Sequence, residues 1–174
     1  AESYLNTDQE LLAANEFRQL ATSRPNSPLA DDAQFGVCRS FWAVSPDLPR
    51  DQEFTEKTIE ECTRLLEFFP RSPLVGDARD LVAQARQKMA AKELRVGRYY
   101  YDRTFYESAI IYFENILQTY PEADVVPETL LVLHYSYSRV GFQMEADLVQ
   151  QRLLELYPDS EQAQELAEAA GDEG

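Results

Sequence analysis

The sequence predicts an all-α fold built from repeated helical hairpins, and two observations carry this prediction. First, an apolar helical run ends at a proline four times, at Pro25, Pro70, Pro121 and Pro158. Proline cannot continue a helix, so each of these positions is expected to be a helix end. Second, alanine lies twelve residues before Pro25, Pro121 and Pro158, and phenylalanine lies eight residues before Pro25 and Pro121. A small residue lets two helices cross closely and a large one fills the groove between them, so this spacing predicts paired helices.

The segment 92–121 matches the 34-residue tetratricopeptide (TPR) pattern most fully. The residues at its consensus positions are Val96, Gly97, Tyr100, Ala109, Phe113 and Pro121. Gly97 is expected to let two helices approach, Tyr100 to wedge between them, and Pro121 to end the hairpin. We therefore predict TPR-like hairpins stacked in a right-handed superhelical array. The alternative is an unrelated helical bundle whose apolar stripes imitate the pattern.

The pattern divides a single array, residues 1–170, into successive elements. Hairpins are predicted at about 1–25, 31–70, 74–121 and 127–158, followed by a capping helix at 160–170 and a disordered tail at 171–174. Residues 45–52 lengthen the turn of the second hairpin. Residues 74–91 are an extra helical stretch that is expected to run unbroken to residue 101. The first hairpin begins in mid-repeat, so we expect further repeats upstream in a longer protein.

The composition excludes several classes of partner. The chain has 31 Asp and Glu residues against 16 Lys and Arg residues, a net charge of −15 and a pI of about 4.4. Nucleic acid is therefore not an expected partner, since binding phosphates needs clustered cations. Direct docking on an anionic lipid surface is disfavoured for the same reason. No window reaches the roughly 18 apolar residues of a membrane span, and the first residues do not have the order of a signal peptide.

Several segments resemble the BamD family of bacterial outer-membrane lipoproteins. They are residues 12–20 (LAANEFRQL), 25–33 (PNSPLADDA) and 69–72 (FPRS), together with Asp51, Gln52 and Thr55 in and after the long turn. The most specific segment is 88–94 (KMAAKEL) leading into Tyr99 and Tyr100, because ordinary TPR units lack this lead-in helix. The resemblance covers nearly the whole chain, from about residue 10 to residue 160.

The resemblance implies a protein-binding scaffold of the machinery that assembles outer-membrane β-barrel proteins. Such a protein would sit at the periplasmic face of the outer membrane, held by an N-terminal lipid anchor that is absent from this chain. Its partners would be the periplasmic POTRA region of a BamA-like barrel protein, other lipoproteins of the assembly complex, and unfolded outer-membrane proteins. The family's substrate-binding role belongs to N-terminal repeats that are largely missing here, so this segment would serve partner docking.

Candidate binding residues come from the first helix of each hairpin, which lines the concave face of a TPR array. They are Phe35, Arg39, Trp42, Arg98, Tyr101, Asp102, Tyr135 and Arg139. Aromatic residues and arginines are the residues that dominate binding energy at protein interfaces. Arginines presented in series on an acidic chain suggest a partner with local carboxylates. The alternative is that the arginines only neutralise neighbouring acids such as Asp32, Asp102 and Glu128.

The two cysteines, Cys38 and Cys62, fall at facing positions of the second hairpin. A disulfide is geometrically feasible there, and the alternative, which the sequence favours, is two small buried thiols that fill space. The single histidine, His134, has apolar neighbours and is expected to be a core residue. Adjacent acids such as Glu60 and Glu61 are expected to lie on solvated faces or near helix N-termini.

No catalytic site, metal site or cofactor site is predicted. The sequence contains no Ser–His–Asp set, no glycine-rich phosphate loop and no His–Glu–x–x–His motif. The leading prediction is therefore a non-enzymatic scaffold of outer-membrane protein assembly. One alternative is another bacterial TPR adaptor, in a cell-envelope or cytosolic complex, and another is an accessory array that holds a catalytic partner. A lipobox cysteine upstream would favour the first prediction over the others.

Overall fold

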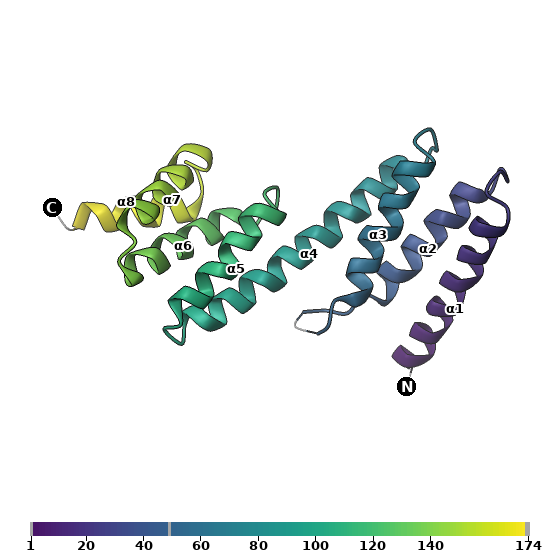
Figure 1. Cartoon of the computed structure of the whole chain (residues 1–174), viewed down its shortest axis with the longest axis horizontal. Helices are drawn as coiled ribbons and strands as arrows, with labels where there is room; N and C mark the ends of the chain where they lie inside the picture. The colour runs from purple at the N-terminus through teal and green to yellow at the C-terminus, as the bar shows by residue number, and fades with distance from the viewer. Residues whose placement is uncertain (1, 49, 173–174) are drawn as a thin grey trace. The chain divides into compact units, whose positions relative to one another are not determined.

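The computed structural model describes the backbone of residues 2–48 and 50–172, and the side chains of residues 8–48 and 50–169. All regular structure in these residues is helical (Figure 1), which confirms the predicted all-α class. In chain order the helices are α1 (Glu2–Ser23), α2 (Ala30–Val44), α3 (Glu53–Phe68), α4 (Val75–Tyr101), α5 (Tyr106–Thr119), α6 (Val126–Val140), α7 (Gln143–Leu156) and α8 (Glu161–Asp172).

The chain forms two compact units that divide within α4. The first unit is Ala1–Met89 and the second is Ala90–Gly174. The first unit pairs α1 with α2 and α2 with α3, and the second pairs α5 with α6 and α6 with α7, with α8 against the α6–α7 pair. No helix among the described residues is long and apolar enough to cross a membrane.

The first residues differ from the prediction. A hairpin was expected at 1–25, but a single helix, α1, occupies Glu2–Ser23. The physical reason is that residues 2–23 contain neither proline nor glycine, so nothing in the backbone ends the helix before the turn at Pro25. At the other end of the chain, α8 continues to Asp172, which is inside the predicted tail 171–174, and residues 173–174 lie outside the described residues.

Three helices end just before a proline, as the sequence predicts, because the residue before a proline disfavours the helical conformation. Helix α3 ends at Phe68, α5 at Thr119 and α7 at Leu156, each two residues before a proline. Residues 45–52 connect α2 to α3, and α4 runs without a break across the stretch in which the sequence predicts one long helix.

The two phenylalanines that the sequence pattern identifies both pack onto glycines. In the second unit, a Cβ placed on Gly97 would lie 2.8 Å from Cδ1 of Phe113, whose ring is fully buried. In the first unit, a Cβ on Gly36 would lie 2.7 Å from the ring of Phe17. Ordinary van der Waals contact needs more than 3.4 Å. Glycine is therefore required at both positions, because it lets the backbone of one helix touch an aromatic ring of the next.

Each unit has its own apolar core. In the first unit, Ala14 of α1 meets Val37 and Phe41 of α2, and Leu65 of α3 packs with Ala78 of α4. In the second unit a larger cluster contains residues from the C-terminal part of α4 and from α5, α6, α7 and α8. Its largest fully buried side chains are Phe113, Ile116, Val126, Leu130, Leu133 and Leu153. These cores fix the faces of α2 and α4 that carry the candidate binding residues.

Candidate protein-binding surfaces

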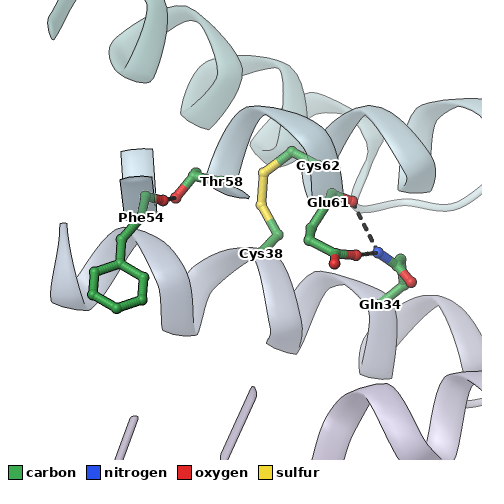
Figure 2. Close-up of a disulfide and its surroundings, with 6 residues drawn as sticks. All are labelled: Gln34, Cys38, Phe54, Thr58, Glu61 and Cys62. Atoms are coloured by element: carbon green, nitrogen blue, oxygen red, sulfur yellow. Dashed lines mark hydrogen bonds between the residues drawn. A yellow bond between two sulfur atoms is a disulfide. The ribbon is translucent and has the colours of Figure 1, made fainter. Parts of the chain in front are cut away.

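A disulfide crosslinks the hairpin that carries the first candidate residues. Cys38 of α2 and Cys62 of α3 are joined, with their Cα atoms 5.2 Å apart and both residues fully buried (Figure 2). The structure therefore has the disulfide, where the sequence favoured two free buried thiols. The reason is that both side chains occupy the same level of the α2–α3 interface, so their Cβ atoms point at each other.

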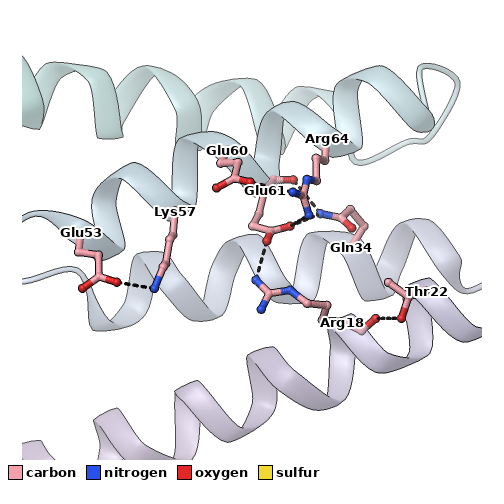
Figure 3. Close-up of polar contacts among 8 residues, drawn as sticks. All are labelled: Arg18, Thr22, Gln34, Glu53, Lys57, Glu60, Glu61 and Arg64. Carbon is pink, nitrogen blue, oxygen red and sulfur yellow. Dashed lines mark hydrogen bonds and ion pairs between the residues drawn. The ribbon is translucent and has the colours of Figure 1, made fainter.

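Glu61 corrects a second expectation. The sequence predicted that Glu60 and Glu61 lie on a solvated face or near a helix N-terminus. Both lie within α3, and only Glu60 is exposed, whereas the Glu61 side chain is 5% exposed. The Glu61 carboxylate accepts hydrogen bonds from Arg18 Nη2 at 2.5 Å and from Gln34 Nε2 at 3.0 Å (Figure 3). Arg64 lies between the two acids, 2.7 Å from Glu60 and 3.5 Å from Glu61. Successive helical residues point in different directions, so one acid can face water while its neighbour ties α3 to α1 and α2.

Phe35 and Arg39 lie in one groove of the first unit, of about 410 Å³. We call it the first groove; its lining is Glu10, Ala13, Phe17, Asp32, Phe35, Gly36, Arg39, Ser40, Ala43, Leu74 and Asp77. Helix α2 contributes residues spaced three or four apart, which share one face of the helix. The other walls come from α1, from Leu74 just before α4, and from the first turn of α4. The groove could hold an apolar side chain against its phenylalanines, beside one arginine and three carboxylates.

Trp42 lies outside the first groove and packs at the base of the long turn. Lys88 Nζ of α4 sits 5.3 Å from the Trp42 ring centroid, close enough for a cation–π interaction. Lys88 also donates to the Ser45 hydroxyl at 2.8 Å and to the Ser45 carbonyl at 3.2 Å. Burial lowers the pKa of the Lys88 ammonium, and the nearby Asp47 carboxylate opposes this effect. Trp42 and Lys88 together hold the start of the turn, at Ser45, against α4.

The turn itself is held by a chain of hydroxyl and amide groups. Ser45 Oγ lies 2.5 Å from Thr55 Oγ1, and Thr55 donates to Gln52 Oε1 at 2.6 Å. Gln52 is fully buried and donates to the Pro46 carbonyl at 3.2 Å. The resemblance named Gln52 and Thr55 as family-like residues, and the structure gives them this internal structural role.

In the second unit, Arg98 and Asp102 lie in a groove of about 380 Å³. We call it the second groove; its lining is Ala91, Leu94, Arg95, Arg98, Tyr99, Asp102 and Arg103. Arg98 Nη1 pairs with Glu128 Oε1 of α6 at 2.5 Å. The sequence left open whether Arg98 meets carboxylates of a partner or only neutralises a neighbouring acid such as Glu128. The structure shows the pair with Glu128.

The remaining candidates are packed or lie apart from the second groove. Tyr101 packs edge-on against Tyr106, with ring centroids 5.4 Å apart. The Tyr135 hydroxyl lies 3.4 Å from Glu165 Oε1 of α8. Burial raises the pKa of Tyr135, and the Glu165 carboxylate and the Tyr101 phenol add to this shift. Arg139 is exposed in the last turn of α6, where a cation favours the helix dipole.

His134 is partly buried, and its ring makes a hydrogen bond within the helical core. Its Nδ1 lies 2.9 Å from the Ala146 carbonyl of α7, and its ring meets Tyr135 edge-on. The ring therefore joins α6 to α7. Among the described side chains, no three His, Cys, Asp or Glu residues gather as metal ligands.

Sequence reasoning missed Arg95, Tyr99 and Arg103 as groove residues. These three residues follow each other at intervals of four; Arg95 and Tyr99 share one side of the C-terminal part of α4, and Arg103 lies in the turn just after the helix. The sequence did contain a signal for this groove, because two arginines spaced four residues on either side of a tyrosine are unusual on a strongly acidic chain. The residues of the first groove that lie outside α2 had no comparable signal, because a periodic pattern relates only residues of the same helix.

Comparison with known proteins decides the family. A family described as YfiO, outer membrane lipoprotein, matches residues 3–153. The chain belongs to the YfiO family of outer membrane lipoproteins. Membership in this YfiO family confirms the resemblance seen in the sequence and places the protein at the outer membrane.

Relatives named "Outer membrane protein assembly factor BamD" support the same family. The chain is 28% identical over 148 residues to the protein of Neisseria meningitidis serogroup A, covering 80% of this chain and 55% of that protein. It is 25% identical over 122 residues to the Caulobacter vibrioides protein (70% and 40%) and 27% identical over 122 residues to that of Xylella fastidiosa strain 9a5c (70% and 41%). The chain therefore spans about half the length of the curated relatives it matches.

Proposed function

We propose that this chain is a non-catalytic scaffold of outer-membrane protein assembly that docks the periplasmic POTRA region of a BamA-like barrel protein. It acts at the periplasmic face of the outer membrane, where the full-length protein is lipid-anchored. Other assembly-complex lipoproteins and unfolded outer-membrane proteins are further partners in this proposal.

Membership in the YfiO family is the observation that carries the proposal. The relatives bear the name of outer-membrane assembly factors. The architecture supports it, because stacked helical hairpins bind through surface area and present long faces to other proteins. The two grooves on α2 and α4 supply the aromatic and arginine side chains that typically anchor such contacts.

The direct test measures binding of the purified chain to the purified POTRA region of the BamA-like protein from the same organism. The variant carries both Arg98→Glu and Arg139→Glu. We expect its affinity to fall at least tenfold, which is about 1.4 kcal/mol. Thermal stability should change little, because the side chain of Arg98 is 53% exposed in its pair with Glu128 and exposed pairs are worth at most about 1 kcal/mol.

The matched control is Arg152→Glu, an exposed residue of α7 in the same unit. It should leave binding unchanged. Retained affinity in the double variant, with reduced stability, would show that these arginines are structural. The first groove would then be examined with Phe35→Ala and Arg39→Glu. Absence of any binding between the wild-type chain and the POTRA region would refute this docking proposal and favour another TPR adaptor role.

A further inference from the structure

The second groove concentrates cations on a chain whose net charge is −15. Arg95, Arg98 and Arg103 line it together with one acid, Asp102, and all four residues are exposed. Arg98 is already paired with Glu128. Arg95 and Arg103 are therefore the positive charges with which the groove could attract an anionic ligand.

The Arg103 side chain is held in place by Tyr99. Its guanidinium stacks on the Tyr99 ring, 3.6 Å from the ring centroid, and its Nη1 donates to the Tyr99 carbonyl at 3.3 Å. Stacking leaves the edge of the guanidinium free for a bidentate contact with a carboxylate. Holding the side chain in place also reduces the conformational entropy that binding would otherwise cost.

The spacing of these groups defines the ligand. Arg95 and Tyr99 are neighbours one helical turn apart on α4, with about 5–6 Å between Cβ atoms, and the Arg103 guanidinium stacks on the Tyr99 ring, so the two cations flank Tyr99. Alternate residues of an extended peptide point the same way and are about 6.6 Å apart. One further turn toward the N-terminus, Ala91 and the buried Leu94 form an apolar floor. An apolar side chain two residues before the first carboxylate would lie there.

We propose that the second groove binds an extended acidic segment of a partner protein, with an apolar residue and two carboxylates on alternate positions. Charge complementarity argues for such a segment, because an acidic peptide is repelled by most of this chain and attracted at this groove. The same overall charge disfavours an anionic membrane, which would have to approach a broad acidic surface. The groove also carries Arg98 of the docking proposal, but peptide binding is measured without the POTRA region, so a failure of one proposal is distinguishable from a failure of the other.

The test uses the whole chain and a fluorescein-labelled ten-residue peptide of glycine and serine, with leucine at position three and glutamates at positions five and seven. We expect saturable binding by fluorescence anisotropy that weakens as salt is raised. A peptide with glutamines replacing both glutamates should bind at least tenfold more weakly. A peptide with glutamates at positions five and six, which point to opposite sides, should also bind more weakly than the first.

Protein variants complete the test. Arg95→Glu with Arg103→Glu should weaken peptide binding at least tenfold, while Arg79→Glu with Arg152→Glu, which changes the net charge equally at exposed positions, should leave it unchanged. Both double variants should keep the wild-type melting temperature, since all four residues are exposed. Equal binding by the two double variants, or equal binding of the two glutamate peptides, would overturn the proposal. Binding to phosphatidylglycerol vesicles that requires Arg95 and Arg103, without peptide binding, would overturn it in favour of a lipid surface.

Discussion

The contact between Gly97 and Phe113 should make α4 intolerant of any side chain at that point. A Cβ on Gly97 would stand 2.8 Å from Phe113 Cδ1, and the Phe113 ring is fully buried, so it has no space into which to move. Gly97→Leu adds four carbon atoms at this contact. Overpacking of this kind costs about 1–3 kcal/mol. For a chain of this length, each kcal/mol corresponds to roughly 2–4 °C in Tm.

The same helix offers a matched control. A Cβ on Gly76 would meet nothing within 4 Å. Gly76→Leu replaces the same residue with the same side chain on α4, so both variants share any gain in helix propensity, up to about 1 kcal/mol. Urea unfolding followed by circular dichroism at 222 nm should place the Gly97→Leu midpoint below both wild type and Gly76→Leu. Coincident midpoints for the two leucine variants would refute the close packing of α4 on α5.

Three further predictions concern the disulfide, the buried acid and a buried phenol. The folded, air-oxidised protein should contain no thiol that can be alkylated, and two free thiols would contradict the disulfide. Reducing the Cys38–Cys62 bond, whose cysteines are 24 residues apart, should lower the free energy of unfolding by about 3–4 kcal/mol. Glu61→Ala should destabilise the protein by about 1–3 kcal/mol because it removes the buried carboxylate that accepts from the part-buried Arg18 and Gln34. Glu60→Ala should cost at most about 1 kcal/mol; equal urea midpoints would count against this role of Glu61. Burial and a neighbouring carboxylate raise the pKa of Tyr137, so the folded protein holds this proton after the unfolded chain loses it near pH 10. The resulting stability is complete below about pH 10 and is lost as the pH rises above it, and Tyr137→Phe should flatten that loss in urea titrations between pH 8 and pH 11.

Which residues share a groove could be predicted along one helix but not between helices. Phe35 and Arg39 could be placed on one face of α2 because residues four apart always share a face. Phe17, Leu74 and Asp77 complete the same groove, yet Phe17 belongs to α1, Leu74 lies just before α4 and Asp77 is in its first turn. Their arrival at α2 depends on how three helices pack, which no local pattern encodes.

The helix ends and the close helix contacts were determined by the sequence itself. Proline removes a backbone donor and blocks the helical conformation of the residue before it, so Pro70 and Pro121 mark helix ends in any context. The placement of small and large residues is equally local in its logic, which is why Gly97 could be expected at a close helix approach, and Phe113 in the groove between helices, before the packing was known. These features depend on covalent geometry and on neighbours within one hairpin.

The tertiary structure alone decided which charges are buried or paired. Glu60 and Glu61 are chemically identical neighbours, and only the packing of α1 and α2 on α3 makes Glu61 the acceptor for Arg18. Likewise, Arg98 meets Glu128 because α6 lies beside the end of α4. Burial and ion pairing depend on the rotation of each helix and on partners far away in the chain. The free energy of a charged side chain is therefore set by contacts that form only when the helices pack.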